Sequence, residues 1–442
     1  MYSNIRLLDC INQPKALIDK AIELGLSGIA ITDHECLSAH MEVNQYAKTL
    51  REKHPNFTVA LGNEIYLTDD RSTGQKYYHF ILIAKDEIGH RALRELSSIA
   101  WSNSYVDRKM ERVPTLKSEL ANIVSKYPGH LIATTACLGG ELSTNALNMQ
   151  LAEYVNDTDN AYRCYERIVE FMQFCLRLFG NDFYIECAPA STQDQVVVNK
   201  RLLKIAKAFG VKMVPGTDAH YLTEQDRLIH KAYLNSKDGE REIDSFYEFA
   251  RLMSPEETFN LLEYSFEKDD IEWILNNSNE LKEKIKYFSL ERKQIIPKIK
   301  LPIYSEWDIY EFTKPVDWKF AADTWPTLKW LCEEGNVQER YWLYECLKSL
   351  YDKGLQDKSD YWDRLEIEAN VIRYIGNKHD DCLFAYFNTF KHYIDLFWRC
   401  GSIVGPGRGS ATVFLSNYLL GITQLDPVRW NLPYWRLTLI NY

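Results

Sequence analysis

The sequence predicts an α/β fold for roughly the first half of its 442 residues, built from parallel βα units that we expect to close into a barrel. Three observations support this class. Short apolar runs alternate with amphipathic helical patterns, the connections between them are brief, and acidic, imidazole or thiol side chains repeatedly follow the apolar runs.

The first strand is predicted at residues 28–34, Gly-Ile-Ala-Ile-Thr-Asp-His, because an apolar run bounded by glycine is typical of a strand buried on both faces. Before it, Pro14 and Gly25 suit the first turn and the end of a helix over residues 14–24. Further strands are expected at 57–68, 77–85, 130–135, 182–187 and 211–216, and helices at 39–53, 87–101, 160–179 and 194–209.

After residue 220 the pattern becomes mostly helical. Helices are expected at 224–234, from Pro255, within 318–355, and at 361–375, 384–398 and 410–420. The aromatic residues of this half are interpreted as core rather than as a stacking platform.

Composition restricts the function. The formal net charge of -10 excludes binding to nucleic acid by bulk charge, so any contact with DNA must come from local patches. The ten cysteines include no C-x-x-C pair, which favours a reducing, cytoplasmic location over a disulfide framework. No apolar stretch approaches the roughly 18 residues of a membrane span, so no membrane partner is expected.

Candidate metal ligands lie in or just after the predicted strands. Each has an ordinary structural explanation when taken alone: a helix cap, a core histidine, a small buried thiol or a surface acid. Together, at the end of a parallel sheet where active sites lie, they predict a metal site suited to zinc, manganese or iron. The candidates are Asp33, His34, Glu64, His79, Cys137, Asp218 and His220.

A second motif is Gly405-Pro406-Gly407-Arg408-Gly409-Ser410, which lacks the spacing of a Walker A loop or of the Gly-x-Gly-x-x-Gly fingerprint. It is either only a tight turn or a phosphate-binding loop. In the second case Gly407, Arg408, Gly409 and Ser410 would offer backbone N–H groups at the start of the helix over 410–420, with Arg408 as a bidentate partner.

The first set of motifs resembles the polymerase-and-histidinol-phosphatase (PHP) domain. The resemblance rests on Thr32-Asp33-His34, on Gly62-x-Glu64, on His79, on the Ala-Cys-Leu-Gly-Gly run at 136–140 and on Asp218-x-His220-Tyr221. It implies a (β/α)7 barrel in which the seven candidates are metal ligands. It also implies metal-dependent 3′–5′ exonuclease activity or a scaffold role.

The Gly-rich loop, followed by Gly421-Ile422-Thr423 and by Asn431-Leu432-Pro433, resembles the palm of bacterial and phage C-family DNA polymerase III alpha subunits. In that family the Gly-Arg-Gly-Ser element holds the incoming nucleotide's triphosphate. The resemblance therefore implies a PHP-type (β/α)7 barrel followed by a mostly helical partial palm. The corresponding domains are 1–235 (PHP), 236–300 (connecting region) and 301–442 (partial palm).

The sequence departs from the family pattern in two places, and each departure predicts a missing part. The family opens with a strand ending in His-x-His, which the sequence lacks, so two ligands and the first strand of the barrel are expected to be missing. The Asp-x-Asp pair that binds magnesium is not found after Arg436, so no polymerase catalytic residue is assigned and polymerisation by this piece alone is not expected.

We therefore interpret the sequence as an amino-terminal piece of a replicative DNA-directed DNA polymerase, cut at both ends. DNA and deoxynucleotides would be its substrates in the complete enzyme, with Mg²⁺ for polymerisation and a sliding clamp or proofreading subunit as partner. Two alternatives remain open. One is a freestanding PHP-type phosphoesterase or exonuclease, and the other is a non-catalytic replisome assembly module.

Overall fold

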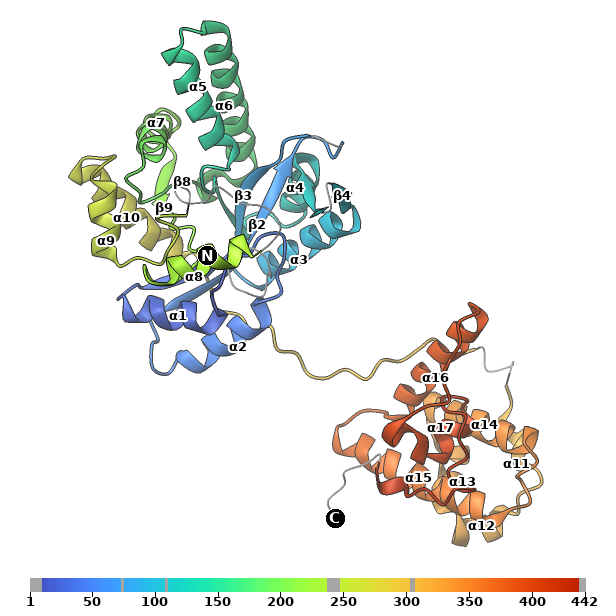
Figure 1. The fold of residues 1–442 in the computed structure, drawn as a ribbon. Helices are drawn as coiled ribbons and strands as arrows, with labels where there is room; N and C mark the ends of the chain where they lie inside the picture. The colour runs from blue at the N-terminus through green and yellow to red at the C-terminus, as the bar shows by residue number, and fades with distance from the viewer. Residues whose placement is uncertain (1–9, 73–74, 108–109, 237–246, 303–306, 437–442) are drawn as a thin grey trace. The chain divides into compact units, whose positions relative to one another are not determined.

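The computed structural model describes residues 10–72, 75–107, 110–236, 247–302 and 307–436. The chain forms two compact units that divide between Arg292 and Lys293 (Figure 1). The two units are described separately below.

The first unit is built on a curled sheet of seven strands within the described residues, in the order β1-β2-β3-β7-β8-β9 with β6 beside β2. Its strands are β1 (Gly28–Ile31), β2 (Thr58–Thr68), β3 (Tyr78–Ala84), β6 (Pro114–Leu116), β7 (Leu131–Thr134), β8 (Phe183–Cys187) and β9 (Lys212–Pro215). A separate two-stranded sheet pairs β4 (Tyr105–Asp107) antiparallel with β5 (Met110–Arg112). The predicted α/β class is confirmed.

The expectation of parallel pairing throughout is wrong for β3, which runs antiparallel to both β2 and β7. The reason is the short link between β2 and β3: it spans only residues 69–77, whereas a parallel crossover needs about a dozen residues or more. The amino end of β3 therefore lies at the same edge of the sheet as the carboxyl ends of β1, β2, β7, β8 and β9.

Over the described residues the sheet is open rather than a closed barrel, because β1 pairs with β2 and β9 pairs with β8 but no pairing joins β1 to β9. Side chains alternate along the strands as the two-residue period requires. Phe80 and Leu82 of β3 join the core beneath the helices, and Ile81 and Ile83 join a smaller apolar cluster on the other face.

Helices cover the sheet. They are α1 (Pro14–Glu23), α2 (His40–Leu50), α3 (Glu87–Ser102), α4 (Lys117–Lys126), α5 (Glu141–Tyr154), α6 (Thr158–Phe179), α7 (Gln193–Phe209), α8 (Asp226–Asn235), α9 (Pro255–Leu262) and α10 (Lys268–Glu283). The antiparallel pair α5 and α6 projects from the sheet (Figure 1). Helices α9 and α10 fall in the expected connecting region, yet Leu262, Ile271 and Ile274 lie in the core of the first unit.

The second unit is mostly helical, as expected. Its elements are α11 (Ile309–Thr313), α12 (Trp318–Thr324), α13 (Pro326–Glu333), α14 (Val337–Asp352), α15 (Ser359–Lys378), α16 (Phe384–Arg399), α17 (Leu415–Leu419) and the 3₁₀ turns η3 (Gly409–Val413) and η4 (Tyr434–Arg436). In its core α14 packs against α13, α16 and α17, and α15 packs against α13 and α17. Trp342 of α14 is fully buried there. None of the described helices is both long and apolar enough to cross a membrane.

The single helix expected over 410–420 is wrong. The 3₁₀ turn η3 ends at Val413, Phe414 is extended, and only then does the short helix α17 begin. The break has a clear physical cause: the buried Glu368 carboxylate of α15 accepts the backbone N–H groups of Leu415 and Ser416. A new helix start is therefore fixed at residue 415 by an acid of the chain itself.

Candidate metal centre

The edge of the sheet where most strands end brings together residues that are far apart in the sequence. His34 follows β1, and its segment continues to pair with β2 because Glu64 N–H donates to Asp33 O (3.1 Å) and Glu35 N–H donates to Glu64 O (2.8 Å). His79 lies at the amino end of β3. The reversed direction of β3 is what places His79 at this edge.

His34, Glu64 and His79 form the tightest group, which we call the metal-ligand cluster. Glu64 Oε1 lies 2.5 Å from His79 Nδ1 and 3.4 Å from His34 Nδ1. One ligand atom from each of the three residues falls within 4.8 Å of the other two, a spacing that a single metal ion could bridge. His34 and Glu64 are almost completely buried, whereas His79 is partly accessible.

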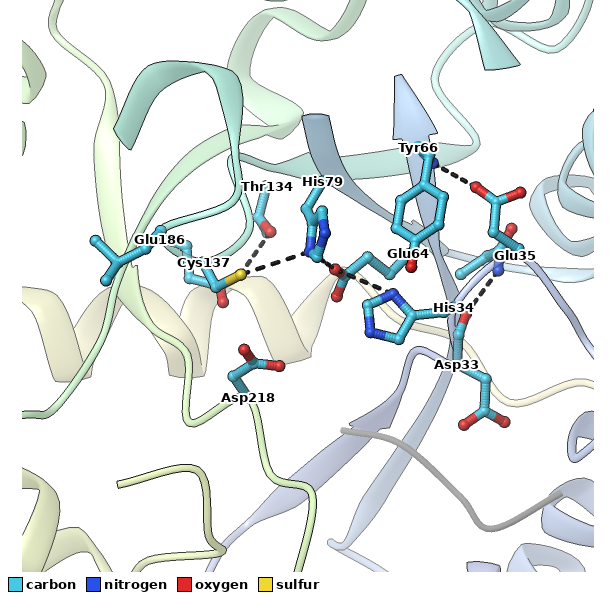
Figure 2. A network of polar contacts seen from close by, with 12 residues as sticks. Asp33, His34, Glu35, Glu64, Tyr66, His79, Thr134, Cys137, Glu186 and Asp218 are labelled. Carbon is cyan, nitrogen blue, oxygen red and sulfur yellow. Dashed lines mark hydrogen bonds and ion pairs between the residues drawn. The ribbon is translucent and has the colours of Figure 1, made fainter. Parts of the chain in front are cut away.

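Cys137 and Asp218 flank this cluster. Cys137 Sγ lies 3.6 Å from His79 Nδ1, and the Asp218 carboxylate lies on the same side as the Cys137 sulfur (Figure 2). Three non-glycine residues with positive φ adjoin the cluster: Glu35 (58°), Ala136 (57°) and Asp218 (46°). Such left-handed residues are uncommon and cost conformational energy, and they concentrate at functional sites.

The other two candidates lie further out. The Asp33 carboxylate points away from the metal-ligand cluster (Figure 2), while its backbone oxygen accepts from Glu64 N–H and from Asn63 Nδ2 (2.7 Å). The His220 ring centroid lies 6.4 Å from that of His34. His220 Nδ1 is 2.7 Å from the Asp218 backbone oxygen, which places the proton on Nδ1 and the lone pair on Nε2.

Glu186 is a site residue that our sequence analysis missed. It is the last residue but one of β8, it is buried, and it lines the same cavity as Glu64, Cys137 and Asp218. The signal was available in the sequence, because an acid near the end of a strongly apolar strand is as unusual as Glu64 in β2.

Burial dominates the electrostatics of the site. It raises the pKa of the Glu64 carboxyl, and it raises the pKa of Glu186 to about 7. Burial also raises the pKa of the Cys137 thiol well above its usual range, and the negative charges of Asp218 and Glu64 add to that effect. A divalent cation would supply the missing positive charge, and imidazole, carboxylate and thiolate ligands together suit zinc, manganese or iron.

Two cavities meet at this site. One, of about 460 Å³, is lined by Glu64, Thr134, Cys137, Glu186 and Asp218 among others, and its remaining wall is largely apolar. The other, of about 400 Å³, shares only Cys137, Thr217 and Asp218 with the first. Asp218 and Cys137 therefore lie where a ligand entering from either cavity would meet the metal-ligand cluster.

The Gly-rich loop of the second unit is exposed from Gly405 to Ser410. Gly407 and Gly409 have φ values of 97° and 62°, and a Cβ at Gly407 would lie 2.8 Å from Thr423 Cγ2. The loop therefore needs glycine at both positions. The Arg408 guanidinium has no hydrogen-bond or ion-pair partner among the described residues and is accessible to a ligand.

Comparisons with known proteins agree with this organisation. Residues 1–190 match the PHP domain, and residues 328–438 match the bacterial DNA polymerase III alpha NTPase domain. The chain is 37% identical over 461 residues to the probable DNA polymerase YorL of Bacillus subtilis (strain 168), a match covering 98% of this chain and 34% of that protein. The DNA-directed DNA polymerase of Bacillus phage SPbeta gives the same figures.

A more distant relative is the DNA polymerase III subunit alpha of Aquifex aeolicus (strain VF5), which is 27% identical over 97% of this chain and 34% of its own length. The chain thus spans about a third of the length of these curated relatives. It combines a PHP domain with a segment of the alpha NTPase domain, in the same order in which the two sets of motifs occur. The chain carries a PHP domain and part of the alpha NTPase domain, and over nearly its whole length it is similar to DNA polymerase III alpha subunits and to a phage DNA polymerase.

Proposed function

We propose that this chain contributes a metal-binding PHP domain and a triphosphate-binding loop to template-directed DNA synthesis, with DNA and deoxynucleotides as the substrates of the complete polymerase. The observation that carries the metal part is the cluster of buried His34 and Glu64 with partly accessible His79 at the edge where most strands end. Asp33, Cys137, Asp218 and His220 are the further candidate ligands. Magnesium would serve polymerisation, and a sliding clamp or proofreading subunit remains the proposed partner.

The chemistry proposed for the first unit is 3′–5′ hydrolysis of a phosphodiester. A divalent ion bound at such a site lowers the pKa of a coordinated water to about 7 and polarises the phosphoester. The residues of the chain would position the metal ligands and admit the substrate. Glu64 Oε1 lies beside Nδ1 of both histidine rings, and the cavities beside Cys137 and Asp218 would admit the substrate.

The test of the metal centre compares wild type with Glu64→Gln, which keeps the shape of the side chain but removes its charge. Wild type should retain Zn²⁺ or Mn²⁺ after gel filtration, and Glu64→Gln should lose most of it, as measured by elemental analysis. A 5′-labelled oligonucleotide then separates the possible roles. Metal-dependent shortening supports an exonuclease, whereas metal binding without cleavage supports a scaffold. Metal content equal in the two proteins would refute this centre.

The triphosphate loop acts through its own N–H groups and Arg408, since the start of α17 is already occupied by Glu368. One charge-assisted contact is worth roughly 1.5–3 kcal/mol, so Arg408→Ala should weaken binding of a deoxynucleoside triphosphate by at least about tenfold. Arg429→Ala, which alters an exposed arginine of the same unit outside the loop, is the matched control. Equal affinities for the two variants would refute the assignment.

A further inference from the structure

Two tyrosines continue the face of the sheet that carries the metal-ligand cluster. Tyr66 of β2 pairs with His79 of β3 and stands two residues after Glu64, so its side chain projects to the same face as theirs. Tyr77 stands two residues before His79 and joins that face as well. The two strands therefore place a layer of aromatic rings directly beside the layer of candidate ligands.

The rings form a row that leads away from the cluster. The Tyr66 ring centroid lies 5.1 Å from that of His79 and 5.5 Å from that of His34 (Figure 2). Beyond it, the rings of Tyr66 and Tyr77 stack with their centroids 4.8 Å apart and an interplanar angle of 30°. The row thus extends from the metal-ligand cluster over a length comparable with the reach of a single nucleotide.

Packing does not account for this pair of tyrosines. Neither ring belongs to the apolar clusters that form the described core of the first unit, and both are partly accessible. The stacked rings of Phe387 and Phe414, by contrast, are both buried in the core of the second unit. An accessible aromatic stack beside a candidate catalytic site is available to a flat ligand such as a nucleobase.

Arg112 brings a positive charge to the outer end of the row. Its Nη1 donates to Tyr77 Oη (2.8 Å), and its guanidinium carbon lies 5.6 Å from the centroid of the Tyr77 ring. Arg373, which covers the face of Trp330, lies only 3.5 Å from that ring centroid. Arg112 is thus held at the hydroxyl end of Tyr77 and leaves the ring face uncovered. It has no ion pair with an acid of the described chain, so its remaining N–H groups are available to a phosphate.

We propose that Tyr77, supported from behind by Tyr66, stacks on a base of the DNA strand that reaches the metal-ligand cluster, while Arg112 binds a phosphate of the same strand. Aromatic stacking combined with arginine is the chemistry by which proteins hold single-stranded nucleic acid without regard to sequence. The inference rests on the nuclease role proposed above and adds a substrate contact to it. A small phosphoester without a base would leave both rings unused.

The test is the binding of 5′-labelled single-stranded oligodeoxynucleotides to the full chain, measured by fluorescence anisotropy in EDTA so that no metal supports cleavage. One oligonucleotide is unmodified, and the others lack the base at the 3′-terminal position, at the position before it, or near the 5′ end. Loss of one of the two bases at the 3′ end should weaken binding by at least about fivefold, the low end of base–aromatic stacking. Loss of the base near the 5′ end should have little effect.

Two variants assign the contacts. Tyr77→Leu should lose the preference for the intact 3′ end, because leucine keeps an apolar side chain but offers no ring. Arg112→Gln should instead weaken the binding of every oligonucleotide alike and reduce the slope of the salt dependence by about 0.7, the value of one phosphate contact on a single strand. Tyr127→Leu is the matched control, since this partly buried tyrosine at the end of α4 also has a cation near its ring, with Lys126 Nζ 5.3 Å from the centroid. It should keep the wild-type preference.

The outcomes separate this inference from the proposed metal centre. Equal binding of all the oligonucleotides by wild type, or an unchanged preference in Tyr77→Leu, would overturn the base platform and leave the metal centre to the comparison with Glu64→Gln. A preference lost equally in Tyr77→Leu and Tyr127→Leu would also overturn it, because the effect would not belong to the row of rings. A preference that depends on Tyr77 in a protein that retains no metal would uphold the platform and overturn the metal centre.

Discussion

His40 and His90 form a buried pair behind β2 that no motif of the sequence indicated. His40 Nε2 lies 2.9 Å from Gly62 O, and since a carbonyl oxygen can only accept, this nitrogen carries the proton. The Nδ1 atom of neutral His40 must then accept from His90 Nε2–H, 3.1 Å away. The pair joins α2, β2 and α3 two residues from Glu64. Protonation of both rings would leave two N–H donors facing each other, and protonation of either ring would bury a positive charge.

The pH dependence of stability should report this pair. Burial lowers the pKa of His40 to about 3 and that of His90 to about 4, whereas an unfolded histidine titrates near 6.5. The unfolded state therefore binds more protons below pH 6.5. Stability contributed by neutral rings is complete above that pH and is lost as the pH falls towards 4. At pH 5 the loss for His40 alone is about 2 kcal/mol.

Urea unfolding at pH 7 and pH 5 measures this loss. We expect the difference between the two pH values to be about 2 kcal/mol smaller in His40→Gln, because glutamine can donate to Gly62 O without titrating. His54→Gln, a less buried histidine of the same unit, should behave like wild type. A His40→Gln variant that retains the full wild-type loss would contradict this account.

Single residues also show where sequence reasoning stops. Chemistry and position at strand ends were enough to select His34, Glu64 and His79, which the structure brings within bridging distance of one ion. Chemistry and position did not reveal that the Asp33 side chain points away from the cluster. The direction of a side chain just after a strand depends on how that segment hydrogen-bonds to the adjacent strand, here through Glu64 N–H and Asp33 O. Glu186 was not among the candidates, although its strand was expected and the residue stands one position before the end of β8.

At the scale of elements, most helices and strands were predicted from periodicity, but helices α4 and α5, the direction of β3 and the helix break at Phe414 were not. The apolar runs located β1, β2, β3, β7, β8 and β9, whereas the antiparallel course of β3 follows from the length and content of the preceding link. The break at Phe414 arises from Glu368, about 50 residues earlier in the chain. Such long-range capping leaves no local signal in the residues that it affects.

Glu368 and Arg364 should be essential to the second unit. Arg364 donates to Glu368 and also to Val413 O (2.6 Å) and Leu432 O (2.7 Å), so the pair ties α15 to the segments on both sides of α17. Removing one partner of a buried ion pair typically costs about 3–5 kcal/mol. Glu368→Gln should lose about that much stability in chemical unfolding, and hydrogen exchange at Leu415 and Ser416 N–H should accelerate.

The control for Glu368→Gln is Asp360→Asn, which neutralises an exposed acid in the first turn of the same helix. Its expected cost is below about 1 kcal/mol, the usual worth of an exposed charge at a helix start. If the two variants lost equal stability, Glu368 would be no more than a surface charge and our explanation of the break at Phe414 would fail.

At the scale of the whole molecule, the two units have separate cores. The first joins the sheet to its helices, including α9 and α10, and the second gathers around α14. The sequence predicted the two kinds of architecture correctly. The structural division at Arg292 lies beyond the expected end of the barrel domain at 235, because amphipathic helices alone do not reveal which core they cover.

Separate cores predict separate responses to ligands. Calorimetry of the intact chain should show two transitions, and Mn²⁺ at about 100 times its dissociation constant should stabilise only the unit that carries His34, Glu64 and His79, by about 2.7 kcal/mol. A deoxynucleoside triphosphate with Mg²⁺ should raise only the other transition, through Gly407 to Ser410, with Mg²⁺ alone as its control. Glu64→Gln should abolish the first shift and keep the second, and Arg408→Ala should do the reverse. One transition moved by both ligands would mean that the two units unfold as one cooperative body, and the separation of metal and nucleotide sites argued here would be lost.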